Sequence, residues 1–379
     1  MKNDPIRVLQ VIGGMDLGGA ESMIMNLYRC IDREKIQFDF LVHTNRKCAF
    51  DDEIEKMGGR IFYVTKFNGK NALRYYQKCN RFFDQHPEIK VVHGHIGSSA
   101  ALYLLAAQKH GCYTIAHSHA ANKITDFKSV VWAIFSYPTR YIANQLFGCS
   151  TEAGKARYGK KAVLSKKYQN FNNGIDVDKY NYNEQTRNDT RKTLELDNKE
   201  ILVGTVGRIS QQKNPEMIYS IFESLVSSNE NVRCIWVGSG ELENTYRDKV
   251  NNSGYANKII MMGRRDDIPQ LLQAMDVMIL PSFFEGLPVT IIEAQAASLP
   301  CVLSDTISRE TAVTDLVTWK SIKESPVQWA DACMSVAKST IYHRINKKED
   351  LVKAGYDIKE TAKWLSQYYF EKYVATVGK

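Results

Sequence analysis

The sequence predicts an α/β protein made of two doubly wound domains, each built on a parallel sheet. Apolar strand patterns alternate with helical patterns along both halves of the chain, and that alternation indicates βαβ units. The 379 residues exceed what one hydrophobic core usually organises and suit two domains. With 44% apolar and 24% charged residues, the composition is that of a folded globular protein, which excludes disorder.

The first predicted domain covers residues 1–176. It ends at the turn signal Asn172-Asn173-Gly174-Ile175-Asp176, and the polar stretch 178–197 that follows is expected to be a linker. The strands expected in this domain are 6–12, 38–43, 60–64, 90–93, 112–116, 140–143 and 168–172.

The second predicted domain covers residues 177–357 and repeats the same scheme. The chain then closes with a helix expected at 358–374 that is rich in aromatic residues. The strands expected in this domain are 201–206, 232–237, 258–262, 276–280, 300–303 and about 316–318.

The segment 281–293 is the most informative in the chain. An apolar run at 277–281 predicts a buried strand, and Gly286 and Pro288 close a short loop before a helix expected at 290–298. Proline is favoured at the first helical position, and the N–H groups of a helix start suit a phosphate.

Two carboxylates, Glu285 and Glu293, belong to this segment. We expect Glu285 in the loop and Glu293 in an early helical turn, so both could accept hydrogen bonds from the hydroxyls of one ligand. The alternative for Glu293 is that it only stabilises the start of the helix electrostatically.

Arg208 and Lys213 follow the strand expected at 201–206 through a glycine turn. A guanidinium binds phosphate oxygens in pairs and an ammonium supplies a mobile charge, so the two could hold a diphosphate without metal. The alternative is that both are solvated loop cations. Because the acidic pair also follows a strand in the same domain, we favour a shared site.

Glycines also follow the strand expected at 6–12 and precede a helix, with Gly18 and Gly19 directly before it. Backbone without Cβ allows a ligand to approach closely, and a helix start favours negative charge. A dinucleotide-binding turn is the rival interpretation, but the spacing is not Gly-x-Gly-x-x-Gly.

Histidines occur in two His-x-His pairs, at His93 and His95 and at His117 and His119. Such pairs can ligate a metal ion. A histidine at the end of a strand also fits the edge of a doubly wound sheet where ligands bind, and we expect His117 to be an active-site residue on that ground.

These features together resemble glycosyltransferase family 4, the retaining sugar-nucleotide transferases of the GT-B fold. The resemblance covers nearly the whole chain, and one departure is Ser298, where we expect glycine in many relatives. The segments that carry it are Gly-Gly-Ala-Glu (18–21), Val-Val-His-Gly-His (91–95), Ile-Ala-His-Ser-His (115–119), Asn-Gly-Ile-Asp (173–176), Gly-Arg…Lys-Asn (207–214), Val-Gly-Ser-Gly-Glu (237–241) and the pair Glu285 and Glu293.

The resemblance implies two Rossmann-like domains that face each other across a cleft. The first, 1–176, would bind the acceptor and would be joined by the final helix at about 358–379. The second, 177–357, would bind the nucleotide sugar.

The same resemblance implies roles for individual residues. Arg208 and Lys213 would hold the donor diphosphate and stabilise its charge as it departs. Glu285 would bind hydroxyls of the donor sugar, and Glu293 would bind the nucleotide ribose. The other expected donor contacts are Gly18, Gly19, Gly263, Gly286, Leu287 and Pro288.

Three residues of the first domain would contact the transferred sugar or the acceptor. His117 matches the active-site histidine of the family, and His119 could exchange roles with it. Asn122 is expected to make a further contact of this kind.

The implied reaction moves a hexose or N-acetylhexosamine from a UDP-sugar to a glycan or lipid-linked acceptor, in the synthesis of capsule, exopolysaccharide or another surface glycan. We expect neither metal nor cofactor, and we prefer front-face displacement assisted by the departing diphosphate. A UDP-sugar epimerase of GT-B architecture and a non-catalytic GT-B partner subunit remain alternatives.

The net positive charge lies in the amino-terminal half. Residues 1–190 hold 27 basic and 18 acidic residues, a balance of +9, whereas residues 191–379 hold 23 and 24, a balance of −1. Between 123 and 167 there are nine basic and two acidic residues. This positive charge would attract lipid head groups or a polyprenyl diphosphate. A nucleic-acid partner would account for the basic amino-terminal half but for no feature of the other half, so we do not expect one.

Within this basic region, residues 127–138 carry large apolar side chains at helical spacing. They are either a core helix or an interfacial helix on the inner membrane leaflet. The cysteines are scattered singly, and no signal peptide or long apolar run is recognised, so we expect a cytoplasmic protein that is peripheral on the membrane.

Overall fold

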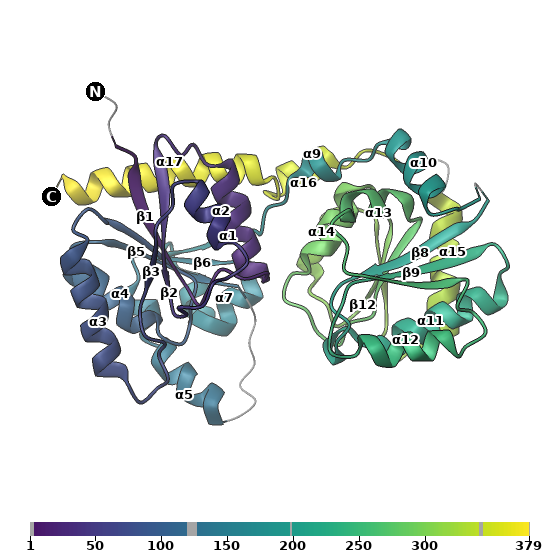
Figure 1. Cartoon of the computed structure of the whole chain (residues 1–379), viewed down its shortest axis with the longest axis horizontal. Coiled ribbons are helices and arrows are strands. Elements are labelled where there is room, and N and C mark those ends of the chain that lie inside the picture. Colours follow the sequence, from purple (N-terminus) through teal and green to yellow (C-terminus); the bar gives the residue numbers. More distant parts are fainter. Residues whose placement is uncertain (1–3, 120–126, 198, 341–343, 379) are drawn as a thin grey trace. The chain divides into compact units, whose positions relative to one another are not determined.

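The computed structural model describes residues 4–119, 127–197, 199–340 and 344–378. The chain divides into two compact units; in Figure 1 the first is coloured purple to blue and includes the yellow final helix, and the second is coloured teal to yellow-green. The first unit contains residues 1–174 and 358–379, and the second contains residues 175–357. The first boundary therefore lies between Gly174 and Ile175 rather than after Asp176.

The first unit is built on a seven-stranded parallel sheet in the order β3-β2-β1-β4-β5-β6-β7. The direction of the order reverses at β1 and β4, which pair through Val8 and Val91 and form the switch point of a doubly wound sheet. Its strands are β1 (Ile6–Ile12), β2 (Ile36–Val42), β3 (Ile61–Tyr63), β4 (Val91–Gly94), β5 (Tyr113–Ser118), β6 (Gln145–Gly148) and β7 (Tyr168–Asn170).

Helices cover both faces of the first sheet. Residues of α1 and of the long final helix α17 build the core on one face, where Leu365 and Tyr369 are fully buried, and α3 and α4 cover the other face. The helices are α1 (Gly19–Cys30), α2 (Asp51–Lys56), α3 (Ala72–Gln85), α4 (Ala100–Lys109), α5 (Phe127–Ser136), α6 (Thr139–Ile142), α7 (Thr151–Tyr158), α8 (Lys160–Val163) and α17 (Ile358–Val377).

The strand expected at 140–143 is wrong. Those residues form the short helix α6, because the Pro138 carbonyl accepts the N–H groups of Tyr141 and Ile142 over 2.9 and 3.1 Å. The strand at this place in the sheet is β6, a few residues later. The apolar pair Tyr141 and Ile142 is compatible with either structure, and proline at the start favours a helical turn.

The second unit is built on a six-stranded parallel sheet in the order β10-β9-β8-β11-β12-β13. This is again a doubly wound order, with its switch point between β8 and β11. The prediction of two Rossmann-like parallel-sheet units is therefore confirmed. The strands are β8 (Ile201–Val206), β9 (Val232–Val237), β10 (Ile259–Gly263), β11 (Val277–Leu280), β12 (Cys301–Ser304) and β13 (Val317–Lys320).

The second sheet is likewise covered on both faces. Residues of α11, α12 and α15 build one core, and those of α13 and α14 build the other. The helices are α9 (Val177–Tyr180), α10 (Glu184–Thr193), α11 (Pro215–Ser228), α12 (Glu243–Asn251), α13 (Ile268–Ala274), α14 (Val289–Ala296), α15 (Pro326–Thr340) and α16 (Lys348–Lys353), with single 3-10 turns at Gln211–Lys213 and Arg309–Thr311.

The expected linker at 178–197 is wrong, because this stretch holds α9 and α10 of the second unit. Arg187 and Arg191 of α10 are buried and bond to Asp276, with Nη2 of Arg187 2.5 Å from Oδ1 and Nη1 of Arg191 3.2 Å from Oδ2. Paired charges can be buried where single ones cannot. A polar sequence here reflects a buried ion-pair cluster, not a solvated linker.

Candidate active site

The loops that follow β8 and β11 meet at the switch point of the second sheet. Val203 and Gly204 pair with Val277 and Met278, so the two strands end at the same edge. Ligands of doubly wound sheets bind beyond this edge, where neighbouring connections run to opposite faces. The predicted cations follow β8 and the predicted carboxylates follow β11, so the fold brings the two halves of the predicted donor site together within the second unit.

Hydrogen bonds tie these two loops to each other. The Phe283 N–H donates to the Gln212 carbonyl over 2.9 Å, and the Asn214 side chain donates to the Pro281 carbonyl over 3.2 Å. Asn214 has a left-handed backbone with a φ of 56°, which turns the chain from the 3-10 turn into α11. Asparagine visits this conformation more readily than most residues.

Lys213 and Glu285 form an ion pair between the loops. Nζ of Lys213 lies 2.7 Å from Oε1 of Glu285, and the two side chains are 16% and 8% exposed. The Gln212 amide donates to the other carboxylate oxygen over 3.4 Å and to the Phe284 carbonyl over 3.0 Å. A pair that retains some access to solvent can exchange partners when a ligand supplies both an anion and hydroxyl groups.

Arg208 is exposed at the start of the loop after β8 and has no hydrogen bond or ion pair within the described ranges. The backbone on either side of it contacts the loop after β9 directly. A Cβ on Gly238 would lie 1.9 Å from the Gly207 carbonyl oxygen, and one on Gly240 would lie 2.3 Å from that of Ile209. Only glycine allows so close an approach, so these two glycines fix the path of the chain at Arg208.

Glu293 lies on the second turn of α14 and accepts a hydrogen bond of 2.8 Å from the Tyr180 hydroxyl. Burial raises the pKa of Glu293, and the hydrogen bond from Tyr180 together with the charge of Lys179 offsets part of that rise. Burial and the neighbouring carboxylate also raise the pKa of Tyr180. The carboxylate keeps unused acceptor capacity, which suits a ligand hydroxyl.

The start of α14 differs slightly from the prediction. The helix begins at Val289, and Pro288 is its N-cap with an extended ψ of 104°, rather than its first helical residue. Pro288 makes no side-chain capping bond to this helix, so its first N–H groups can bind an anion. Leu287 is buried, whereas a Cβ on Gly286 would meet no atom within 4 Å.

Gly263 lies at the same edge of the sheet but at the end of β10. Its φ is 63°, and its carbonyl accepts the Gly238 N–H over 2.8 Å. It therefore adjoins the glycines beside Arg208 rather than the acidic pair.

Gly18 and Gly19 lie in the first unit at the start of α1, where Gly18 is the N-cap. A Cβ on Gly18 would lie 2.2 Å from a carboxylate oxygen of Glu21, so that carboxylate sits over the helix start. Burial raises the pKa of Glu21, and the charge of Asp16 adds to the rise. Glu21 therefore competes with any phosphate for this helix end.

Four histidines, of which three are buried and His119 is partly buried, gather at the switch point of the first sheet. His93 and His95 come from the end of β4, and His117 and His119 come from the end of β5. His93 Nε2 lies 3.2 Å from His117 Nδ1, and His95 Nδ1 lies 2.8 Å from His119 Nε2. Burial lowers the pKa of all four, to about 3 for His93 and His119, so the rings are neutral near pH 7. The third predicted contact, Asn122, lies outside the described residues.

Three histidines of the same cluster are close enough to share a metal ion, since ring nitrogens of His93, His95 and His117 lie within 4.8 Å of one another. The rings are stacked, however, with centroids 4.4 Å apart between His93 and His95 and 5.3 Å apart between His93 and His117. Metal ligands instead direct their lone pairs to one point. The arrangement suits a hydrogen-bonded array better than a metal centre.

One Asp-x-Asp triplet, a pattern that can hold a metal ion, stands at Asp176-Val177-Asp178. Asp176 caps α9 by accepting the Lys179 N–H, and Asp178 pairs with Lys348 at 2.5 Å. Both carboxylates thus have structural partners.

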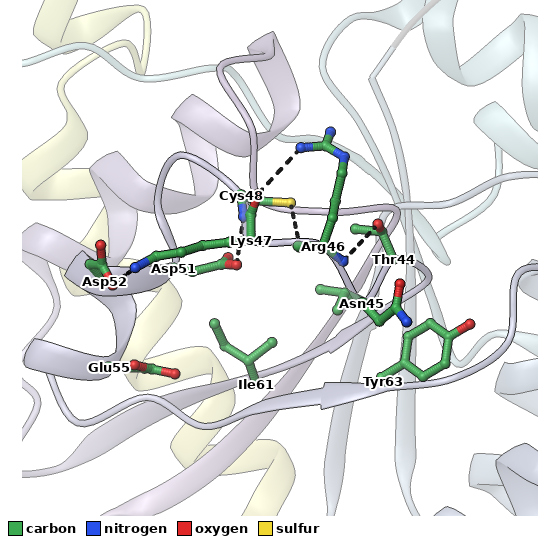
Figure 2. A pocket seen from close by; sticks show the side chains of 11 residues that line it. Thr44, Asn45, Arg46, Lys47, Cys48, Asp51, Asp52, Glu55, Ile61 and Tyr63 are labelled. Atoms are coloured by element: carbon green, nitrogen blue, oxygen red, sulfur yellow. Dashed lines mark hydrogen bonds and ion pairs between the residues drawn. The ribbon is translucent and has the colours of Figure 1, made fainter.

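A surface pocket of about 430 Å³ lies beyond β2 and β3 of the first unit, and Figure 2 shows the side chains that line it. Arg46 pairs with Asp16 of the glycine loop after β1, and Lys47 pairs with Asp52 at 2.6 Å. The charged groups of this pocket thus largely neutralise one another. None of the predicted site residues lines it.

Comparison with known proteins identifies the family. Residues 186–357, all in the second unit, match the family described as Glycosyl transferases group 1. Over 374 residues the chain is 30% identical to EpsF of Bacillus subtilis, which carries a glycosyltransferase name, and the match covers 97% of each chain. The chain belongs to the glycosyl transferases group 1 family.

Other relatives and a solved structure agree with this assignment. The glycosyltransferase is 25% identical over 392 residues to CapH of Staphylococcus aureus, a capsular polysaccharide biosynthesis glycosyltransferase, with 97% and 99% of the two chains covered. Over 137 residues, or 35% of each chain, it is 34% identical to the Escherichia coli UDP-Gal:alpha-D-GlcNAc-diphosphoundecaprenol alpha-1,3-galactosyltransferase. The crystal structure of Anabaena Alr3699/HepE in complex with UDP matches this chain with a TM-score of 0.78 and 16% sequence identity. The match covers 96% of this chain and 100% of that one. The predicted GT-B fold is therefore confirmed.

Within the described ranges of the glycosyltransferase, no helix is both long enough and apolar enough to cross a bilayer.

Several residues of the candidate site had no predicted role. Tyr180 lies in the stretch predicted to be a linker, and its partner is 113 residues away, so the sequence carries no signal for this contact. Gly238 and Gly240 stand in a segment that carried the family resemblance, and two glycines after a strand could have indicated a close backbone approach. Gln212 and Asn214 support the ion pair through side-chain hydrogen bonds to the loop after β11, which sequence spacing does not indicate.

Proposed function

We propose that the chain is a retaining glycosyltransferase of family 4 that transfers a hexose or N-acetylhexosamine from a UDP-sugar to a glycan or lipid-linked acceptor. The product would belong to a capsule, an exopolysaccharide or another surface glycan. The ion pair between Lys213 and Glu285 at the switch point, with Arg208 exposed on the same loop as Lys213, is the observation that carries the proposal.

Each charged group of this site suits one part of a UDP-sugar. Arg208 and Lys213 bind the diphosphate, the Glu285 carboxylate accepts hydrogen bonds from sugar hydroxyls, and Glu293 accepts them from the ribose. The diphosphate replaces Glu285 as the anion that contacts Lys213, and the released carboxylate turns to the sugar. Binding thereby separates the ion pair, and both halves gain a new partner.

The two cations also favour the chemical step. As the bond between the anomeric carbon and the diphosphate oxygen breaks, negative charge grows on that oxygen, where Arg208 and Lys213 stabilise it. The acceptor oxygen bonds to the anomeric carbon on the same face, and its proton passes to the departing diphosphate. This front-face displacement retains configuration, and the two cations take the charge-stabilising role without a metal ion or cofactor.

UDP is the proposed nucleotide. The protein in the HepE crystal structure binds UDP, and the Escherichia coli relative is named for UDP-Gal and for an acceptor on diphosphoundecaprenol. Both lines of support come from other proteins and agree with the surface-glycan role of CapH.

The experiment is a donor screen with UDP-glucose, UDP-galactose, UDP-N-acetylglucosamine and UDP-N-acetylgalactosamine in the presence of a bacterial lipid extract. UDP release is measured for the wild type and for Lys213→Ala, Glu285→Ala and the control Lys258→Ala. Lys258 donates to the Glu230 carbonyl at the opposite edge of the same sheet. Loss of release in the first two variants alone supports the site, and equal activity in all four proteins refutes it; proton NMR of the product tests retention.

We further propose that the acceptor side of the enzyme rests on the cytoplasmic face of an anionic membrane. Large apolar side chains of this region are exposed: Ile134 of α5 by 65%, Tyr141 of α6 by 70% and Leu164 beside α8 by 88%. Arg140 stacks on Tyr137 with its guanidinium 4.0 Å from the ring centroid. Exposed basic residues of the same region, Lys160, Lys161 and Lys166, add attraction to anionic lipid.

Flotation with vesicles of phosphatidylglycerol and phosphatidylcholine tests the membrane surface. Binding that falls with rising salt and is weakened in Tyr141→Ser and in Lys160→Gln is the expected result. Binding that is equal to phosphatidylcholine alone, or unaffected by both changes, contradicts it. The scattered single cysteines agree with a reducing compartment.

A further inference from the structure

Tyr369 of α17 directs a hydrogen-bond chain that ends at His117. The Gln10 amide donates to the Tyr369 hydroxyl over 3.5 Å, so the one hydroxyl proton is free to be donated to His93 Nδ1, 2.6 Å away. A neutral imidazole carries one N–H, and His93 must therefore carry it on Nε2 and donate it to His117 Nδ1. The proton of His117 then lies on Nε2.

A second hydrogen-bond chain starts at His119 and ends at the side-chain amide of Gln10. The Gln10 carbonyl oxygen lies 2.9 Å from His95 Nε2, which must donate to it. His95 Nδ1 is then an acceptor and takes the N–H of His119 Nε2 over 2.8 Å. The remaining nitrogen of His119, Nδ1, holds a lone pair.

Both open ends, His117 Nε2 and His119 Nδ1, are buried and have no hydrogen-bond partner in the part of the chain that the structure describes. The two rings lie side by side, with centroids 4.2 Å apart. Buried polar atoms without partners are rare in folded proteins and indicate a group that is still to be bound.

The surroundings keep the histidine rings neutral and favour this assignment of donor and acceptor nitrogens. Burial lowers the pKa of both histidines, and the charge of Arg157 contributes to the lowering. The Arg157 guanidinium donates to the carbonyls of His117 and Ile96, each over 3.0 Å. A positive charge nearby stabilises a lone pair on His119 Nδ1 relative to an N–H.

We propose that Gln10 and Tyr369 hold all four histidines in the tautomer with its proton on Nε2. His117 then offers a donor and His119 an acceptor, and together they match one hydroxyl group of a sugar substrate, an inference that rests on the function proposed above. A hydroxyl can both accept and donate, whereas an ionised phosphate can only accept and is disfavoured by the lone pair. Gln10, Tyr369, His93 and His95 are positioning residues in this scheme.

The first test is NMR of the full-length protein with its histidine rings labelled with nitrogen-15. Long-range correlations between ring protons and nitrogens distinguish protonated from unprotonated nitrogen in each ring. All four rings are expected to carry the proton on Nε2. A proton on Nδ1 of either His117 or His119 overturns the proposal.

Tyr369→Phe removes the donor that directs the first chain, so His93 and His117 should become mixtures of tautomers while His95 and His119 stay unchanged. The control is Tyr368→Phe, because the Tyr368 hydroxyl bonds to Tyr113 and Gln145 rather than to histidine. If His117 keeps a single tautomer in folded Tyr369→Phe, the proposal fails. If that variant does not fold, the wild-type spectrum decides alone.

Addition of UDP-glucose tests the hydroxyl contact. The signals of His117 Nε2 and His119 Nδ1 should shift with UDP-glucose and stay in place with UDP. If calorimetry shows that UDP-glucose binds and neither signal moves, the hydroxyl contact is wrong. If UDP-glucose does not bind at all, the proposed function fails instead, and the tautomer assignment is still decided by the spectra.

Discussion

Lys213 Nζ and Glu285 Oε1 lie 2.7 Å apart, so a cation and a carboxylate from two different loops neutralise each other at the edge of the second sheet. The two residues are assigned to different parts of one ligand, the diphosphate and the sugar. Their pairing makes nucleotide binding a competition between the diphosphate and Glu285 for the same ammonium group.

Glu285→Gln should separate these two roles. The change removes the anion that competes for Lys213, so UDP should bind as tightly as in the wild type or more tightly. UDP-glucose should bind about 10-fold more weakly, because a hydrogen bond to a charged acceptor contributes about 1.5–3 kcal/mol and the neutral amide contributes less. Calorimetric titration of both ligands measures the difference; weaker binding of UDP itself would show that Glu285 contacts the nucleotide.

Glu293→Gln should stabilise the protein at neutral pH while weakening UDP binding. Burial raises the pKa of Glu293 above its value in the unfolded chain. The stability that the protonated Glu293 carboxyl contributes is therefore fully present below pH about 4.5 and is lost as pH rises through the folded pKa. The amide keeps an acceptor for Tyr180 and removes the buried charge. The melting temperature should therefore rise at pH 7.5 and not at pH 4; a fall at pH 7.5 would mean that the charge has a partner that stabilises the fold.

Gly238→Ala should impair donor binding by displacing the backbone beside Arg208. The new Cβ would lie 1.9 Å from the Gly207 carbonyl oxygen, at a φ of 134°. The matched control is Gly254→Ala, which also has a positive φ, 72°, but would meet no atom within 4 Å. Both variants should lose stability, whereas only Gly238→Ala should lose about 10-fold or more in UDP affinity. Equal UDP affinities of the two variants would show that the loop after β9 does not contribute to the donor site.

Ser298→Gly should increase stability by about 1 kcal/mol. Ser298 has a φ of 54° at the end of α14, a conformation that costs a side-chain-bearing residue roughly 1–2 kcal/mol, and its buried hydroxyl has no hydrogen-bond partner among the described residues. The greater freedom of glycine in the unfolded chain offsets part of the gain.

Chemical denaturation measures the free energy of unfolding, with Ser282→Gly as the control. Ser282 is also buried, but its φ is not positive, so its replacement should destabilise the protein. A loss of stability in Ser298→Gly would contradict the strain argument.

The strand and helix scheme could be predicted from the sequence where apolar runs are continuous. The predicted limits of β8 and β9 coincide with the structure, because strands buried on both faces read as mostly apolar segments, here interrupted only by Thr205 and Arg233. The same apolar signal was misleading at Tyr141, where proline at the start favours a helical turn. At position 298 the backbone has a left-handed φ of 54°, a conformation that favours glycine, so the structure supplies a physical reason for expecting glycine there.

The meeting of the loops that carry Lys213 and Glu285 was predictable from the sequence, but most contacts of the candidate site were not. Placing Arg208, Lys213 and Glu285 together required only that two strands end at one edge, a general property of parallel sheets. The partners of Glu293 and Asp276 were not predictable, because Tyr180 and Arg187 lie in a polar stretch that resembles a linker. Likewise, the link from Tyr369 to the histidines depends on how α17 packs on the first sheet, which no local pattern encodes.

A crystal structure of the full-length protein with UDP tests the central claim most directly. The account predicts diphosphate oxygens within about 3 Å of the Arg208 and Lys213 side chains, with Lys213 separated from Glu285 and a ribose hydroxyl on Glu293. UDP bound elsewhere, for example in the pocket beside Arg46, with the pair of Lys213 and Glu285 intact, would contradict it.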